Sequence, residues 1–255
     1  MPEGAFSLAG RTAIVTGSTR GIGFAIARAL GGAGAAVVVT GEDAAEVAAA
    51  EVLLADEGAQ VRGIVCDVTD EVALAALVGV TMEAFGGLDI LVCNAGITGI
   101  AGSWATVDFD RVMAVNLRSM VALTALALPH MAARGGGSVV LMSSLSALRG
   151  NAAINAYALA KAGVAQLARN LAVQWGPQGV RVNAVAPGLI ATPLAAPFMA
   201  DAAFMARRLQ MTPLRRVGTV EEVAATCLFL ASSAAAFITG QHIAVDGGTS
   251  VTDGG

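Results

Sequence analysis

Residues 12–30 read TAIVTGSTRGIGFAIARAL, and this stretch decides the fold. The apolar run 12–16 is typical of a buried strand, and the apolar spacing over 21–30 is typical of a helix. The turn between them is Thr16-Gly17-Ser18-Thr19-Arg20-Gly21-Ile22-Gly23. Because glycine has no Cβ, a pyrophosphate can approach backbone N–H groups in such a turn and meet the positive end of the helix dipole. The stretch predicts a strand–turn–helix unit for a dinucleotide, and a tight turn without a ligand is the alternative.

Strand and helix patterns alternate along the rest of the chain. The further strand-like runs are 36–40, 61–65, 90–93, 138–142, 181–186 and 242–245. The further helical patterns are 43–57, 70–85, 106–133, 155–175 and 220–231. Strands that are apolar throughout are typical of a parallel sheet with helices on both faces. We therefore expect an α/β fold, a single doubly wound Rossmann-type domain over residues 1–255 with a mainly parallel, seven-stranded sheet.

The segment after the sixth strand has a different character. Residues 187–213 contain four of the seven prolines and show little periodicity. We expect residues 188–213 to form a loop or short helices that cover the substrate. The apolar residues of this segment argue, weakly, against a highly charged substrate.

The composition excludes several classes of protein. With 56% hydrophobic and 13% charged residues among 255, the chain is too apolar for disorder. The net charge of −4 argues against a nucleic-acid partner, which needs a basic surface. Mean hydropathy is +0.71. No run reaches the roughly 18 uninterrupted apolar residues of a membrane span, so no membrane association is expected.

The cysteines and the first residues indicate the compartment. Cys66, Cys93 and Cys227 are far apart, and no CxxC or Cys/His cluster is present. This usage predicts neither a disulfide framework nor a metal site. Residues 1–11 lack the basic start and apolar run of a signal peptide. A cytoplasmic location is therefore expected.

One tyrosine and one lysine stand out, because the chain has no other of either type. Tyr157 and Lys161 are four residues apart in a helical pattern, so they should share one helix face. A phenol has a pKa near 10, and a neighbouring ammonium group should lower it. The pair is a candidate general acid/base for a carbonyl or alcohol oxygen. The alternative is a core tyrosine and a surface lysine.

The end of the second strand bears on the choice of dinucleotide. The sequence there is Thr40-Gly41-Glu42-Asp43. An acidic residue at this place accepts from a ribose 2′-hydroxyl and repels a 2′-phosphate, so Glu42 favours NAD(H) over NADP(H). Arg20 in the turn could instead hold a phosphate. The alternative for Glu42 is a solvated carboxylate at the start of a helix.

Motifs over nearly the whole chain resemble the short-chain dehydrogenase/reductase family. Ser144 precedes Tyr157 by 13 residues, as in the family's Ser…Tyr-x-x-x-Lys arrangement. The other matching segments are Cys66-Asp67-Val68, Asn94-Ala95-Gly96, Val115-Asn116-Leu117, Pro187-Gly188-Leu189-Ile190-Ala191-Thr192, Ile238-Thr239-Gly240-Gln241 and Val245-Asp246-Gly247-Gly248. The departure is Glu42, where family members with Gly at the strand end often have Arg.

The resemblance implies a role for each matching residue. Tyr157 is the proton donor or acceptor, Lys161 lowers its pKa and holds the nicotinamide ribose, and Ser144 binds the substrate oxygen. Asn116 bends its helix and anchors a proton relay. The implied cofactor contacts are Gly17, Thr19, Arg20, Gly21, Ile22, Gly23, Glu42, Asp67, Val68, Asn94, Ala95, Gly96, Tyr157, Lys161, Pro187, Gly188, Ile190 and Thr192. The candidate substrate contacts are Ser146, Leu189 and Leu194.

Plain alternatives exist for some of these residues. Ser143 and Ser146 are nearby hydroxyls, and only the spacing selects Ser144. Asn116 could cap backbone groups within its helix, and Asp67 could cap the turn after its strand. The two histidines, His130 and His242, are expected to be structural and distant from the motifs.

The function expected from these residues is reversible hydride transfer between NAD(P)(H) and a secondary alcohol or ketone. A 3-oxoacyl-carrier-protein reductase-like enzyme and a non-catalytic dinucleotide sensor are the alternatives. The apolar helical patterns 106–133 and 155–175 predict pairing between copies, as a homodimer or homotetramer.

Overall fold

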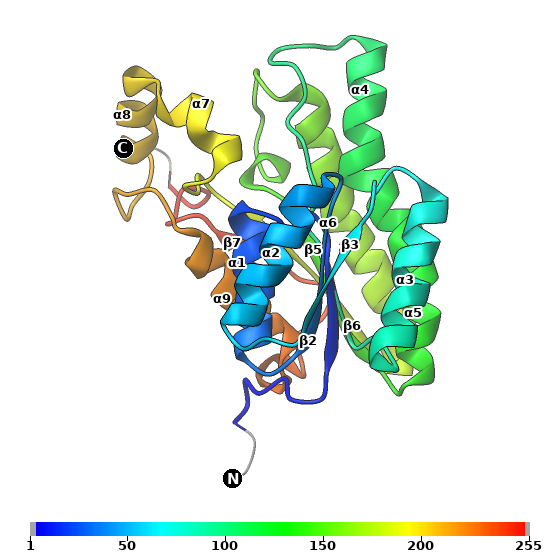
Figure 1. The fold of residues 1–255 in the computed structure, drawn as a ribbon. Coiled ribbons are helices and arrows are strands. Elements are labelled where there is room, and N and C mark those ends of the chain that lie inside the picture. Colours follow the sequence, from blue (N-terminus) through cyan, green and yellow to red (C-terminus); the bar gives the residue numbers. More distant parts are fainter. Residues whose placement is uncertain (1–3, 253–255) are drawn as a thin grey trace.

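The computed structural model describes residues 4–252, and its centre is one parallel sheet (Figure 1). The strand order is β3-β2-β1-β4-β5-β6-β7, and every neighbouring pair is parallel. The strands are β1 (Thr12–Val15), β2 (Ala36–Gly41), β3 (Val61–Val65), β4 (Ile90–Cys93), β5 (Gly137–Met142), β6 (Val180–Pro187) and β7 (His242–Val245). The order reverses direction between β1 and β4, so a crevice opens there at the carboxyl ends of the strands. The predicted fold class and seven-stranded sheet are confirmed.

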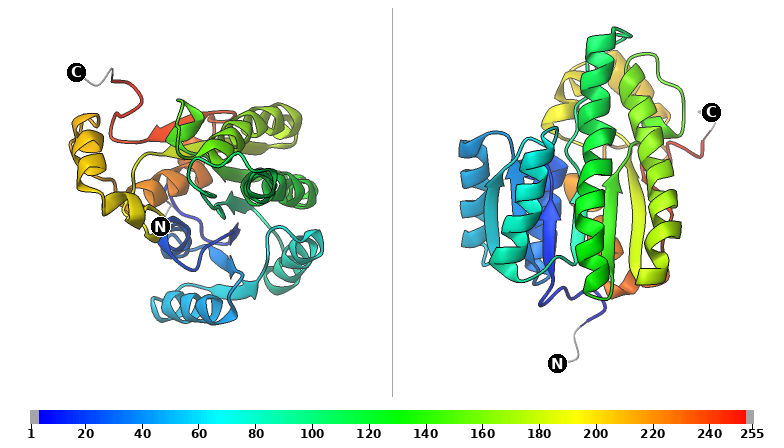
Figure 2. Two further views of the ribbon diagram at one scale, coloured as in Figure 1. Left: turned by 90° about the horizontal axis from the view of Figure 1, so that it is seen from above. Right: turned by 90° about the vertical axis from the view of Figure 1, so that its right-hand side faces the viewer.

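Helices cover both faces of the sheet (Figure 2). The helices are α1 (Gly21–Gly32), α2 (Ala44–Asp56), α3 (Glu71–Phe85), α4 (Thr106–Met113), α5 (Ser119–Ala133), α6 (Asn155–Trp175), α7 (Ala196–Met199), α8 (Ala202–Gln210) and α9 (Val220–Ala231). Short helical turns are η1 (Ala114–Arg118), η2 (Leu145–Ala147), η3 (Gly176–Gln178), η4 (Pro193–Ala195) and η5 (Ser233–Ala235). The first and last of the long helices, α1 and α9, pack on one face together with α2, and α3, α5 and α6 pack on the other.

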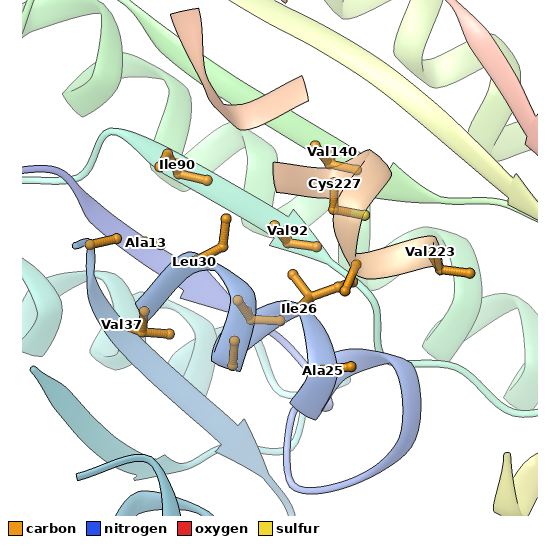
Figure 3. Packing of buried hydrophobic residues seen from close by; sticks show 14 of the residues in the cluster. Ala13, Ala25, Ile26, Leu30, Val37, Ile90, Val92, Val140, Val223 and Cys227 are labelled. Carbon is orange, nitrogen blue, oxygen red and sulfur yellow. The ribbon is translucent and has the colours of Figure 1, made fainter. Parts of the chain in front are cut away.

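The two faces bury separate hydrophobic cores. Ile26 and Leu30 of α1 pack against Val92 of β4 and Cys227 of α9, as Figure 3 shows. On the opposite face, Leu123 of α5 belongs to the second core. A fully buried side chain of this size contributes about 1.5–3 kcal/mol to folding. Two such cores hold the sheet rigid, which positions the strand ends.

The predicted helix over residues 106–133 is interrupted. A π-helical turn, η1, separates α4 from α5. The run Thr106–Ala133 is long and apolar enough to cross a membrane by length and composition alone. Part of this apolar character is used in packing, since Leu123, Leu128 and Met131 are buried against the sheet, whereas Val107 and Val121 are exposed.

The segment after β6 forms short helices. It contains η4, α7 and α8, where we expected a loop or short helices. Asp201 caps α8 by accepting from the backbone N–H groups of Ala203 and Phe204. In Figures 1 and 2, α7 and α8 stand off the sheet beyond the carboxyl ends of the strands.

Candidate active site

A cavity of about 240 Å³ opens at the carboxyl ends of the strands. Predicted site residues from five parts of the chain line it: Ile22, Asn94, Gly96, Ser144, Ser146, Tyr157, Lys161, Pro187, Gly188, Leu189, Ile190, Thr192 and Leu194. The remaining predicted residues lie in the glycine-rich turn, at the ends of β2 and β3, and behind the cavity wall. The topology thus brings the predicted catalytic and nicotinamide-side residues together.

The glycine-rich turn before α1 leaves no room for side chains. A Cβ on Gly17, whose φ is +60°, would lie 2.8 Å from Ala95 Cα, and one on Gly23 would lie 2.1 Å from the Gly17 carbonyl oxygen. No side chain caps the N-terminus of α1. Backbone N–H groups at a helix start and a turn without Cβ atoms fit the pyrophosphate of a dinucleotide.

Asn94 holds this turn against the end of β4. Its Nδ2 donates to the carbonyl oxygens of Thr16 and Gly17, at 3.1 and 2.8 Å. The backbone N–H groups of Asn94 and Ala95 donate to Thr16 Oγ1. The asparagine amide is therefore committed to positioning the turn.

Tyr157 and Lys161 lie on the same face of α6, as their spacing predicts. Lys161 Nζ is 5.5 Å from the centroid of the Tyr157 ring. The lysine is only 2% exposed, and Nζ donates to the Met142 carbonyl oxygen at 2.7 Å. The alternative of a surface lysine is therefore wrong.

Asn116 lies in the π-helical turn next to Lys161. Its Nδ2 donates to the carbonyl oxygens of Ile97 and Val112, each at 2.9 Å, and its Oδ1 accepts from the Ile97 N–H. A Cβ on Gly96 would lie 2.7 Å from Asn116 Oδ1 and 3.5 Å from Lys161 Nζ. Because Gly96 has no side chain, the Asn116 amide and the Lys161 ammonium group can both lie close to the Gly96 backbone.

Ser144 presents its hydroxyl to the cavity. The residue directly follows β5 and caps η2, and its Oγ accepts from the Ser146 N–H at 3.1 Å. Because the oxygen accepts that bond, the hydroxyl hydrogen is free to donate. Ser146, the competing hydroxyl, lines the same cavity and supplies the backbone donor.

Burial controls the ionisation of the pair. Burial raises the pKa of Tyr157, and hydrogen bonding from Ser144 opposes this less strongly. Burial lowers the pKa of Lys161 from 10.5 to about 7. The pKa of Tyr157 is therefore raised in this structure, because removing the phenolate from water costs more than the hydrogen bond from Ser144 returns; the stabilisation of the phenolate by Lys161 stays a prediction.

His242 is not distant from the motifs, as the sequence suggested. Its Nε2 lies 3.0 Å from Ser143 Oγ, which also donates to the Lys161 carbonyl oxygen at 2.8 Å. The contact arises because β7 pairs with β6, which places His242 of β7 opposite Ala184 of β6. Sequence spacing carries no signal for it, since Ser143 and His242 are 99 residues apart. His130 is exposed near the end of α5.

Glu46 is a site residue that the sequence analysis missed. It lies in the first turn of α2 and accepts from Thr19 Oγ1 at 2.9 Å and from Arg20 Nη1 at 2.5 Å. Glu42, the acid expected to act here, is exposed and follows the end of β2. Helical spacing from the Asp43 cap, which places Glu46 one turn into α2, was the available signal.

Asp67, which follows β3, caps the turn after its strand, as the alternative interpretation of this residue predicted. Its Oδ1 accepts from the backbone N–H and the side-chain Oγ1 of Thr69. Asp67 is exposed, and Val68 is buried beside it. The carboxylate therefore shapes the turn and still faces solvent at the strand end.

The segment after β6 is held against the C-terminal signature. A Cβ on Gly188 would lie 2.8 Å from Asp246 Cα. Ile190 is buried and pairs with Gly218, and Thr192 Oγ1 accepts from the Ala195 N–H. These contacts position Leu189 and Leu194 on the cavity wall.

A turn shaped for a pyrophosphate and buried hydroxyl groups beside it, at one edge of one sheet, define a dinucleotide-dependent oxidoreductase. A sequence profile described as enoyl-(acyl carrier protein) reductase matches residues 17–250. The cis-4-hydroxycyclohexanecarboxylate dehydrogenase of Sinomonas cyclohexanicum is 44% identical over 248 residues, 95% of this chain and 97% of that protein. The dehydrogenase/reductase SDR family member 4 of Oryctolagus cuniculus is 38% identical over 244 residues, 94% of each protein.

A solved structure agrees with these relatives. The gluconate 5-dehydrogenase of Burkholderia cenocepacia, in complex with NADP and tartrate, superposes with a TM-score of 0.94 at 34% identity. The match covers 97% of this chain and 98% of that chain. The chain belongs to the short-chain dehydrogenase/reductase family. It is an NAD(P)(H)-dependent oxidoreductase of the kind that acts on alcohol and ketone groups.

Proposed function

We propose that this chain interconverts a small secondary alcohol and its ketone with NAD(H), using Tyr157 as general acid and base. The observation that supports this most directly is that Ser144, Tyr157 and Lys161 line one cavity. NAD(P)(H) supplies or accepts the hydride in such a reaction. A dinucleotide sensor would need none of these three side chains.

Ser144 binds the substrate oxygen in this proposal. Its Oγ already accepts the Ser146 N–H, and its hydroxyl hydrogen, which hydrogen-bonds Tyr157, can donate to a substrate oxygen. A donor fixed before the reaction stabilises negative charge as it develops on the oxygen.

Tyr157 and Lys161 move the proton. The raised pKa keeps the Tyr157 phenol protonated near neutral pH, so it can donate to the alkoxide oxygen that forms during ketone reduction. Lys161, with a pKa of about 7, can return a proton to the phenolate near neutral pH. We propose that Asn116, beside Lys161 at Gly96, anchors the relay towards solvent.

The proposed cofactor contacts lie in the glycine-rich turn, at the ends of β2, β3 and β4, and in the cavity. The proposed contacts are those of the turn (Gly17, Thr19, Arg20, Gly21, Ile22, Gly23), of the β2 and β3 ends (Glu42, Asp67, Val68), of the β4 end (Asn94, Ala95, Gly96) and of the cavity (Tyr157, Lys161, Pro187, Gly188, Ile190, Thr192). The crowding at Gly17 and Gly23 and the uncapped start of α1 support this placement.

NAD(H) is favoured because the one cation of the turn, Arg20, is paired with a carboxylate and a second acid follows the end of β2. Arg20 pairs with Glu46, so a ribose 2′-phosphate would have to compete with a carboxylate for this guanidinium. Glu42, exposed at the end of β2, would repel the same phosphate. The Burkholderia relative binds NADP, so a direct comparison of the two cofactors is needed.

A small-molecule substrate is favoured over an acyl carrier protein. The Sinomonas relative is named for a ring alcohol that bears a carboxylate. A docking surface for an acidic carrier protein would need a group of free basic residues. Arg134 is paired with Asp89, Arg169 donates to Gln166, and Arg149 lines the cavity. We propose that residues 1–255 act as one catalytic domain and that 188–213 cover the bound substrate, with Ser146, Leu189 and Leu194 in contact with it.

Assembly and location complete the proposal. Apolar side chains are exposed on α4–α5 and α6, with Val107 at 83%, Val121 at 46% and Leu159 at 50%. We propose that these helices pair between copies in a homodimer or homotetramer. We also propose a cytoplasmic location, which the three free, buried cysteines support.

Two measurements test the proposal. The first is parallel titration with NADH and NADPH, followed by a panel of ketones with the tighter cofactor; tenfold tighter NADPH binding contradicts the NAD(H) proposal. The second is Tyr157→Phe, which should lose about 10²–10⁴ in turnover, the usual contribution of a general acid, and still bind NADH. Retained turnover would show that another group donates the proton.

A further inference from the structure

Two arginines share the cavity with the catalytic hydroxyls. Arg149 follows η2, and Arg208 approaches from α8. Within residues 4–252, five arginines form ion pairs with carboxylates, and Arg149 and Arg208 are not among them. What distinguishes Arg149 and Arg208 is that both line the cavity that holds Ser144 and Tyr157.

The two guanidinium groups influence each other. Arg208 stacks on Phe204, with its Cζ 5.4 Å from the ring centroid, so its position is fixed from one side. Burial, then Arg149, then Arg207 lower the pKa of Arg208. Because like charges in a partly buried site repel, bringing these side chains together costs free energy unless an anion lies between or beside them.

The rest of the wall is mixed, with the polar residues Asn94, Thr98, Ser143, Asn151 and Thr192 beside an apolar part. Leu145, Ile154, Leu194 and Phe198 line the cavity between the sheet and α7–α8. The site therefore combines a hydroxyl pair for the reacting oxygen, an apolar wall for a carbon skeleton and two guanidinium groups. This combination fits an amphiphilic anion better than a neutral ketone or a polyol.

We propose that the substrate is a hydroxy or oxo acid whose carboxylate is bound by Arg149 and Arg208 while its carbinol or carbonyl oxygen meets Ser144 and Tyr157. The inference rests on the proposed function. It differs from the weak expectation drawn from the apolar residues 187–213, because Arg208 comes from within that segment. A guanidinium pair also suits a phosphate, so the test separates carboxylates from phosphate-bearing thioesters.

The experiment compares matched acids and amides with NADH present. The probes are 4-oxocyclohexanecarboxylate and its carboxamide, 4-oxopentanoate and its carboxamide, cyclohexanone, and acetoacetyl-coenzyme A, each with wild type, Arg149→Gln, Arg208→Gln and the control Arg207→Gln. Arg207 neighbours Arg208 on α8 but does not line the cavity. The readouts are the acid-to-amide ratio of kcat/KM and, without turnover, calorimetric binding of cyclohexanecarboxylate and cyclohexanecarboxamide.

The wild type should prefer at least one acid over its amide by about tenfold or more, as charge-assisted hydrogen bonds imply. Arg149→Gln and Arg208→Gln should each lower that ratio and weaken cyclohexanecarboxylate binding by about tenfold, and Arg207→Gln should change neither. Equal rates on acids and amides, a preference for acetoacetyl-coenzyme A, or an unchanged ratio in both cavity variants would overturn the carboxylate assignment and leave the oxidoreductase proposal intact. No turnover of any probe with NADH or NADPH would instead overturn the proposed function.

Discussion

Replacing Lys161 with methionine should change how the stability of the protein depends on pH. The side chain is buried, and burial lowers its pKa from 10.5 to about 7. Between these values the unfolded chain holds a proton on this lysine that the folded chain has lost. The free energy of unfolding of the wild type therefore rises with pH in this window, and this contribution is lost as pH falls towards 7.

The size of the effect follows from the two pKa values. The pKa of Lys161 is 10.5 in the unfolded chain and about 7 in the folded protein. At 1.36 kcal/mol per pKa unit, this difference raises the free energy of unfolding of the wild type by about 2 kcal/mol between pH 7 and pH 9. Lys161→Met has no such titration. The unfolding free energy of the variant minus that of the wild type should therefore fall by about 2 kcal/mol over this range.

The difference between the two proteins isolates Lys161 from other groups. Burial also raises the pKa of the Cys227 thiol to about 12, and this lowers stability at alkaline pH equally in both proteins. Cys93 interacts with Lys161, so a change in its titration is part of the effect of the substitution. The assay is urea unfolding at pH 7, 8 and 9, followed by circular dichroism. Equal m-values would show that both proteins expose the same surface on unfolding. Parallel pH profiles of wild type and variant would refute the assignment of a buried lysine with a depressed pKa.

Two further substitutions test the site. Glu46→Gln should release Arg20 and tighten NADPH binding relative to NADH by about tenfold in fluorescence titrations, the effect of about 1.4 kcal/mol from one charge contact. Glu42→Gln is the matched control, and a shift in Glu42→Gln alone would mean that the acid at the strand end decides the cofactor. Asn116→Ala should cost about 1–3 kcal/mol in urea unfolding, because it leaves the buried Val112 carbonyl and the half-buried Ile97 backbone groups without their amide partner. Asn170→Ala, at an exposed position on α6, should leave stability nearly unchanged, and equal losses in both variants would contradict the role given to Asn116.

The sequence alone determined the features that depend on local spacing. Glycine at 17 and 21 suits the positive φ of the turn, and a Cβ on Gly23 would meet the Gly17 carbonyl oxygen. A period of four residues places Tyr157 and Lys161 on one face of α6. Continuous apolar runs predicted the parallel sheet because both faces are covered.

Only the tertiary structure decided what depends on contacts between distant segments. The sign of the Tyr157 pKa shift depends on how completely the cavity excludes water, which no spacing reveals. Arg20 meets Glu46, and His242 meets Ser143, through strand order and packing. Arg149 and Arg208 converge because α8 folds over the carboxyl ends of the strands, and electrostatic interactions act through space, whatever the separation along the chain.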